Sequence, residues 1–197
     1  VAVLVPLKAF HHAKSRLGPT LDAEARAGFA RRAADTVLAA AHDLPVTVVC
    51  DDEDVAAFAR DRSAEVLWRP GRGLDGSVQD GVTHLASIGH DLVVVAHGDL
   101  PLATDLRPLA EGHEGVTLVP DRHADGTNVA VVPATAGFRF AYGPGSFARH
   151  RAEARRIGAP LRIVDDDALA WDVDRPTDLD HPDLDRPDLD RPEPPDA

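Results

Sequence analysis

The chain has 197 residues, of which 44% are hydrophobic and 27% are charged, and its formal net charge is −12. This composition suits one compact α/β domain, and the acidic balance argues against nucleic acid as a partner. No apolar run approaches the roughly 20 residues of a membrane-spanning helix. Cys50 is the single cysteine, which excludes an intrachain disulfide and favours a cytoplasmic location.

Short runs rich in Val and Leu alternate with segments of helical periodicity along most of the chain. This alternation predicts βαβ units around a mainly parallel sheet with helices on both faces. The predicted strands are 1–5, 46–50, 65–68, 92–96, 116–119, 128–132 and a late one near 161–164, and the predicted helices are 22–41, 53–62, 75–88, 104–111 and 145–157. Ligands of such sheets bind at the carboxyl ends of the strands, so the loops that follow the strands are the candidates for chemistry.

The end of the chain, DLDHPDLDRPDLDRPEPPDA, repeats a short D-R-P-D-L unit. Its prolines remove backbone donors, and it has too few apolar residues to form a core. We therefore predict a single domain over residues 1–179 and a disordered acidic tail over 180–197.

The loop after the first strand, PLKAFHHAKSRLGP, contains Lys8, Lys14 and Arg16 just before a helix. Three cations at a strand end can neutralise a polyphosphate, and the helix N-terminus adds to the positive potential. They could equally be solvated surface charges. The loop lacks the G-x-x-x-x-G-K-[ST] pattern of a P-loop.

The loop after the LVVVA strand is HGDLP, in which Asp99 follows the buried strand and Gly98 allows close approach to the backbone. A carboxylate in this position is a candidate ligand of a divalent cation. The alternative is that Asp99 caps a helix.

A second acidic motif, WDVDRPTDL, contains Asp172 and Asp174 in an extended segment. Residues two apart in a strand share a face, so both carboxylates could point at one cation. Capping of the next helix explains the pattern equally well, because Asp174 precedes Arg175-Pro176 with Asp178 three residues on.

Between these motifs lie DRHADGTNVAVVP and FRFAYGPGSFARHRAEA. Gly143 and Ser146 open a helix and offer backbone donors and a hydroxyl to a second anion. Ser146 could also be a simple N-cap. Arg149, His150 and Arg151 either strengthen an anion pocket or face water.

Taken in order, PLKAFHHAKSRLGP, HGDLP, DRHADGTNVAVV, FAYGPGSFARH and WDVDRPTDL resemble the guanylyltransferases of coenzyme F-420 biosynthesis, which use 2-phospho-L-lactate or phosphoenolpyruvate. The resemblance covers about residues 1–179. It implies a glycosyltransferase-A-like, Rossmann-related nucleotidyltransferase fold with Mg²⁺ as cofactor. It further implies GTP as donor and a small phosphorylated carboxylic acid as acceptor.

The resemblance also implies roles for individual residues. It assigns metal binding to Asp99 and Asp172, with Asp174 as a further candidate, acceptor binding to Thr127, Gly143 and Ser146, and nucleotide phosphates to Lys8, Lys14 and Arg16. The segment RGLDGSVQDG departs from the family pattern, because Asp75 stands where relatives usually have Asn near the nucleotide. An acid can accept a hydrogen bond from the nucleotide but cannot donate one.

The Ala-, Arg- and Gly-rich composition is typical of a GC-rich bacterial genome and favours phosphoenolpyruvate as the acceptor. The alternatives are 2-phospho-L-lactate and, more distantly, 3-phosphoglycerate. Nucleotidyltransferases for sugar phosphates, methylerythritol phosphate or molybdopterin usually begin with L-x-A-G-x-G-x-R-M-G, which this chain lacks. A non-catalytic sensor of a phosphometabolite would have no need of carboxylates at both Asp99 and Asp172.

Overall fold

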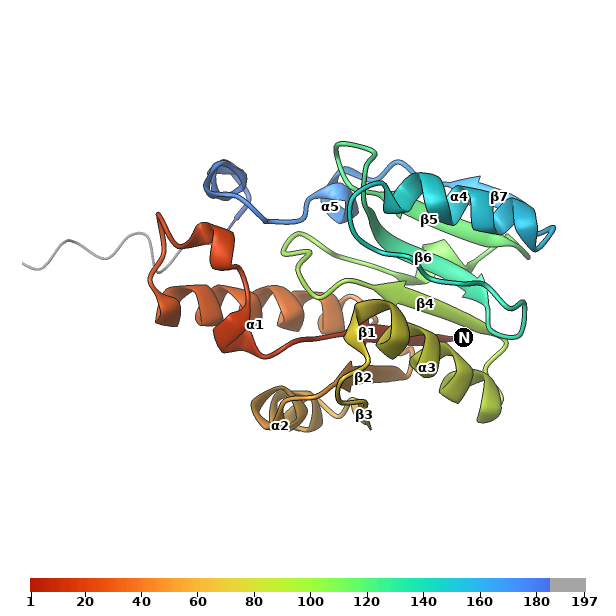
Figure 1. Cartoon of the computed structure of the whole chain (residues 1–197), viewed down its shortest axis with the longest axis horizontal. Helices are drawn as coiled ribbons and strands as arrows, with labels where there is room; N and C mark the ends of the chain where they lie inside the picture. The colour runs from red at the N-terminus through yellow and green to blue at the C-terminus, as the bar shows by residue number, and fades with distance from the viewer. Residues whose placement is uncertain (185–197) are drawn as a thin grey trace, which may run out of the picture.

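Seven strands form one sheet in the computed structural model, which describes residues 1–184 (Figure 1). Their order is β3-β2-β1-β4-β6-β5-β7. The strands are β1 Ala2–Pro6, β2 Val46–Cys50, β3 Glu65–Trp68, β4 Leu92–Ala96, β5 Val116–Pro120, β6 Thr127–Pro133 and β7 Leu161–Ile163. Strand β6 is antiparallel to its neighbours β4 and β5, and the other adjacent pairs are parallel. The expected mainly parallel α/β sheet is confirmed.

Helices cover both faces of the sheet. The α-helices are α1 Ala23–Ala39, α2 Glu53–Asp61, α3 Gly73–Ser87, α4 Ser146–Arg156 and the single turn α5 Asp167–Ala170. Four 3-10 helices join them: η1 Phe10–His12, η2 Ser15–Leu17, η3 Arg107–Ala110 and η4 Pro176–Asp180. Within the described residues, no helix combines the length and apolarity needed to cross a bilayer.

The helix predicted over 104–111 is wrong, because the structure has only η3 there. Pro108 supplies no backbone N–H in this turn. The Asp105 carboxylate accepts both the backbone N–H and the guanidinium of Arg107, which stabilises a turn rather than a continuing helix.

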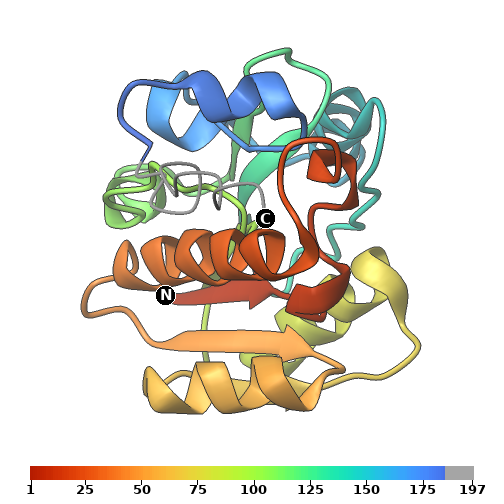
Figure 2. The ribbon, with the colours of Figure 1, turned by 90° about the vertical axis from the view of Figure 1, so that its left-hand side faces the viewer.

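Side chains alternate between two apolar layers along the central strands. Helices α1 and α2 cover one face of the sheet and α3 and α4 the other (Figures 1 and 2). Val3, Val48 and Val94 pack with α1 and α2, whereas Leu4 and Val95 pack with α3 and α4. This alternation follows from the two-residue period of a strand. Burial on both faces explains why the strands are apolar throughout.

A third apolar cluster ties the loop after β1 to the end of the described chain. Leu17 packs there with Phe29 of α1, with Val173 and Leu179, and with Leu184. The packed part of the chain therefore continues past residue 180, where the acidic tail was expected to begin. The rest of that expected tail, 185–197, lies outside the described residues.

Candidate active site

A cleft of about 600 Å³ opens at the carboxyl ends of β1 and β4. Because β6 is antiparallel, its first residue Thr127 lies at this same edge of the sheet. Of the predicted site residues, all except Asp75 line the cleft: Lys8, Lys14, Arg16, Asp99, Thr127, Gly143, Ser146, Asp172 and Asp174. The structure thus brings together residues from five separate sequence motifs.

Asp99 and Lys14 form a partly buried ion pair in the cleft. Lys14 Nζ donates to Asp99 Oδ2 at 2.7 Å and lies 3.5 Å from Asp174 Oδ1. Burial alone would raise the pKa of Asp99, but the charge and hydrogen bond of Lys14 hold it below its usual value. Burial likewise disfavours the charged form of Lys14, and Asp99 outweighs this and raises the lysine pKa. Lys14, predicted to face phosphates, thus contacts two carboxylates.

Asp99 is not a helix cap, since the residues after it form turns and the next helix, η3, has Leu106 as its N-cap. Gly98 has a packing role, because a Cβ at this position would lie 2.1 Å from Cδ2 of Leu7. The glycine therefore allows the β1 and β4 loops to pack closely.

The segment carrying Asp172 and Asp174 is irregular rather than a strand. Asn128 Nδ2 donates to Leu169 O at 3.0 Å and lies 3.4 Å from Asp172 Oδ1. Burial raises the pKa of Asp172, and the nearby charges of Asp99 and Asp174 raise it further. The carboxylates thus lie close enough to repel one another, although no three His, Cys, Asp or Glu side chains in residues 1–184 form a ready-made metal site.

Arg122 and Asp178 hold this acidic segment in place. Arg122 Nη1 donates to Asp172 O at 2.8 Å, Nη2 donates to Asp178, and the guanidinium lies over the Trp171 ring. Asp178 Oδ2 accepts the backbone N–H groups of Asp174 and Arg175 at 2.8 and 2.7 Å. Asp178 is therefore the capping residue, which leaves the Asp174 carboxylate to contact Lys14. The R-P-T-D spacing indicated the cap, but no local signal indicated Arg122.

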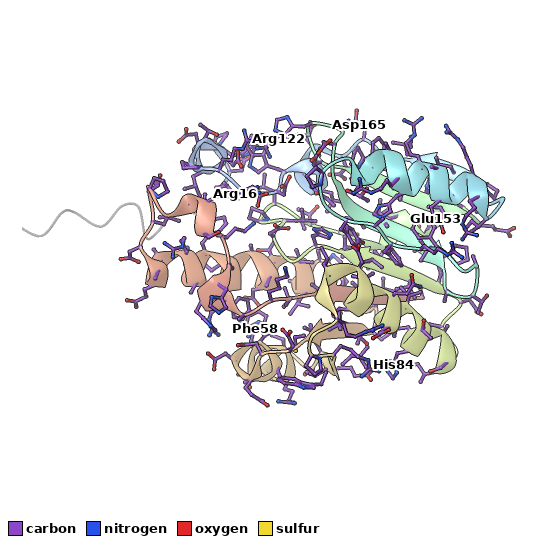
Figure 3. All side chains as sticks on the ribbon, viewed as in Figure 1. Arg16, Phe58, His84, Arg122, Glu153 and Asp165 are labelled. Carbon is purple, nitrogen blue, oxygen red and sulfur yellow. The ribbon has the colours of Figure 1, made fainter. Side chains whose placement is uncertain are left out.

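Figure 3 shows Arg122 and Arg16 at the same end of the molecule, although their loops are far apart in the sequence. The Arg16 side chain is 72% exposed and its Nη1 lies 3.3 Å from Asp174 Oδ2. Lys8 also lines the cleft from the β1 loop. These two cations are the ones from this loop that remain accessible to an entering anion.

The opposite wall contains Thr127 and the residues that open α4. Ser146 is the first residue of the helix and Gly145 is its N-cap, so the alternative in which Ser146 is a simple N-cap does not hold. Ser146 Oγ instead accepts the backbone N–H of Thr127 at 3.1 Å. Gly143 has a left-handed backbone with φ of 92°, which favours glycine at this bend.

The loop of residues 141–144 is fixed by Arg149, whose guanidinium donates to the carbonyl oxygens of all four residues at 2.6 to 3.2 Å. Arg149 therefore supports the loop rather than serving as a free cation for ligands. Asp75 Oδ1 accepts the backbone N–H of Tyr142 at 2.8 Å. Asp75 thus stands behind this loop, and only its neighbour Leu74 reaches the cleft.

His97 and Tyr142 also line the cleft, and their ring centroids lie 4.7 Å apart. Burial lowers the pKa of His97 and raises that of the Tyr142 hydroxyl, so both rings are uncharged near neutral pH. Neither residue was among the predicted site residues, because a lone histidine or tyrosine carries no motif.

Comparisons with known proteins agree with this geometry. Residues 1–182 match the family described as "Guanylyl transferase CofC like". A phosphoenolpyruvate guanylyltransferase of Sphaerobacter thermophilus is 36% identical over 185 residues, covering 90% of this chain and 89% of that protein. A 2-phospho-L-lactate guanylyltransferase of Methanothermobacter thermautotrophicus is 31% identical, covering 89% and 81%.

The fold is shared with solved nucleotidyltransferases. A nucleotidyl transferase from Methanothermobacter thermautotrophicus has a TM-score of 0.64 at 16% identity, covering 90% of this chain and 93% of that one. The expected nucleotidyltransferase fold is confirmed, as is the resemblance drawn from the five motifs. This chain belongs to the CofC-like guanylyl transferase family.

Proposed function

We propose that this protein transfers the guanylyl group of GTP to phosphoenolpyruvate, with release of pyrophosphate, as a step in coenzyme F-420 biosynthesis. The observation that carries the proposal is the single cleft in which cations, carboxylates and a hydroxyl-rich wall face one another. A reaction between a nucleoside triphosphate and a small phosphorylated acid needs all three of these groups close together.

The reaction is an in-line displacement. An oxygen of the acceptor phosphate attacks the α-phosphorus of GTP and forms a new P–O bond. The bond to the bridging oxygen breaks, and its electron pair leaves on pyrophosphate. The acceptor phosphate is already anionic at neutral pH, so no protein nucleophile or general base is required. The barrier is the repulsion of two anions, which positioning and positive charge reduce.

The protein's own cations would reduce the repulsion between the two anionic substrates. Lys8 and Arg16 line the cleft and would stabilise the charge that develops on pyrophosphate. Lys14 adds a buried ammonium between Asp99 and Asp174. Thr127, Gly143 and Ser146 would orient the acceptor on the opposite wall.

Asp99 and Asp172, with Asp174 beside them, are the residues that would hold Mg²⁺. Mg²⁺ commonly binds through one or two carboxylates together with substrate phosphates, so a complete cage of protein ligands is unnecessary. The buried Oδ1 of Asp99, which has no hydrogen-bond partner among the described residues, fits this role. When bound, the ion neutralises charge on the reacting phosphates.

The test is to incubate the protein with GTP, Mg²⁺ and phosphoenolpyruvate, 2-phospho-L-lactate or 3-phosphoglycerate in turn, and to follow pyrophosphate release. Release with phosphoenolpyruvate above the other acids supports the proposal. Faster release with either other acid reassigns the acceptor. The absence of release with all three overturns guanylyl transfer to such acids.

Variants test the carboxylates. Asp99→Asn or Asp172→Asn is expected to lower turnover by at least about a hundredfold, because each removes charge that would anchor the ion. Asp54→Asn, at an exposed position in the first turn of α2, is the matched control and should retain full turnover. Near-normal rates in either cleft variant would refute the metal assignment.

A further inference from the structure

His150 is a fully buried histidine that bridges the two parts of the acceptor wall. Its Nδ1 lies 3.0 Å from Thr127 Oγ1, on the first residue of β6. Its Nε2 lies 3.0 Å from the backbone N of Ala141, in the loop that contains Gly143. One ring thus connects the threonine hydroxyl to the neighbouring loop of the same wall.

The partner of Nε2 fixes the tautomer of this ring. A backbone N–H can only donate, so Nε2 must accept the hydrogen bond from Ala141. In a neutral imidazole the proton is then on Nδ1. Burial lowers the pKa of His150 to about 4, so the ring is neutral near pH 7. His150 Nδ1–H therefore donates to Thr127 Oγ1.

This direction decides what Thr127 offers to a ligand. Its oxygen already accepts from His150, so its own hydroxyl hydrogen cannot point back at the ring and is free to donate. Ser146 Oγ is in the same position, because it accepts the backbone N–H of Thr127. Both residues line the cleft. Among residues 1–184, no hydrogen bond has either hydroxyl as its donor.

We propose that His150 is a positioning residue that makes the Thr127 hydroxyl an obligate donor to an anionic oxygen of the acceptor. With the opposite tautomer, Thr127 would donate to the ring and present lone pairs to the cleft. Lone pairs would repel a carboxylate or phosphate oxygen. The position of the His150 proton therefore decides whether Thr127 attracts or repels the acceptor. This inference rests on the proposed function for the identity of the acceptor.

The kinetic test separates the two ends of the ring. In His150→Gln the longer amide can accept from Ala141 but does not keep the donor at the Nδ1 position. In His150→Asn the amide nitrogen stands close to that position. We expect the glutamine variant to raise the KM for phosphoenolpyruvate roughly tenfold or more, because the Thr127 hydroxyl is no longer held as a donor to the charged acceptor, while the KM for GTP stays unchanged. The asparagine variant should show a KM at least about threefold below that of the glutamine variant.

A double variant tests whether His150 acts through Thr127. Thr127→Val should raise the KM for phosphoenolpyruvate by a similar factor, and adding His150→Gln should raise it no further. Additive effects, or a parallel rise in the KM for GTP, would mean that His150 only supports the fold and would overturn the proposal.

A measurement on the unaltered protein needs no substrate and no variant that must fold. Nitrogen NMR of the His150 ring at pH 7 should show a protonated Nδ1 and an unprotonated Nε2. A ring protonated on Nε2, or on both nitrogens, overturns the inference. If the ring has the expected tautomer but no acid releases pyrophosphate, the proposed function fails while the hydrogen-bond arrangement stands.

Discussion

Arg122 anchors the segment that carries Asp172 and Asp174, and its removal should lower the stability of the protein. Its guanidinium donates to Asp172 O and to the buried carboxylate of Asp178, and it lies 4.3 Å from the centroid of the Trp171 ring. Arg122→Met keeps an apolar side chain of similar length but removes all three interactions. Asp178 then remains buried with the backbone donors of Asp174 and Arg175 and a long hydrogen bond of 3.4 Å from the Thr177 hydroxyl.

The expected loss of stability follows from these contacts. Removing one partner of a buried ion pair costs roughly 3 to 5 kcal/mol, and the lost cation–π contact adds about 0.5 to 1 kcal/mol. The two backbone donors still stabilise the Asp178 carboxylate, so the lower part of this range applies. We expect a loss of about 3 kcal/mol, which in a domain of this size lowers the melting temperature by roughly 6 to 12 °C.

Urea unfolding followed by circular dichroism measures this loss, with an unchanged denaturant slope as a check on two-state behaviour. The control is Arg155→Met, an exposed arginine in the last turn of α4, which should change stability by less than about 0.5 kcal/mol. Arg122→Lys keeps the charge without the forked geometry and should fall between the two. A loss in Arg122→Met no greater than in the control would refute the reasoning.

Two further perturbations test the packing and the protonation state of the fold. Gly115→Ala should destabilise the protein by about 2 kcal/mol or more, because its Cβ would lie 2.0 Å from Pro160 O. Gly76→Ala in α3 should cost far less, because its Cβ would come no closer than 3.3 Å to Arg72 Cβ, and calorimetry of both variants checks this contrast. Because the pKa of His150 falls to about 4 from an ordinary 6.5, its unfolded form binds the proton first on acidification. About 3 kcal/mol of stability, present above pH 6.5, should be lost progressively as the pH falls towards 4, and urea unfolding should show a loss larger by about this amount in the unaltered protein than in His150→Asn.

Most of the sheet was predictable because its strands are buried on both faces. The direction of β6 does not follow from its own residues, since an apolar run such as TNVAVVP has the same pattern in either direction. The connection to β5, residues 121–126, is too short for the crossover that a parallel pair needs. The length of this connection therefore indicated that β6 is antiparallel to β5. The helix predicted at 104–111 failed because Asp105 and Pro108 favour a turn over the local helical pattern.

The members of the candidate site were predictable because strand ends meet at one edge of a sheet, and Asp99 and Thr127 both lie there. Their partners were not, because contacts such as Lys14 with Asp99 or Arg122 with Asp178 join residues far apart in the sequence. Asp75 illustrates the same limit: its position in the chain suggested the nucleotide, yet its carboxylate binds the backbone of Tyr142.

The electrostatics of the cleft explain how an acidic chain could bring two acidic substrates together. Asp99 is compensated by Lys14, which keeps its pKa low, whereas the pKa of Asp172 is raised by burial and by its acidic neighbours. Asp99 is therefore closely paired, whereas the ionised form of Asp172 stays disfavoured although Arg122 Nη1 lies 3.7 Å from its Oδ1. A divalent cation gains most where carboxylates repel one another, because binding removes the repulsion as well as adding attraction. The repulsion around Asp172 thus supports the proposal that this residue would help to hold Mg²⁺, while Lys8 and Arg16 would face the pyrophosphate.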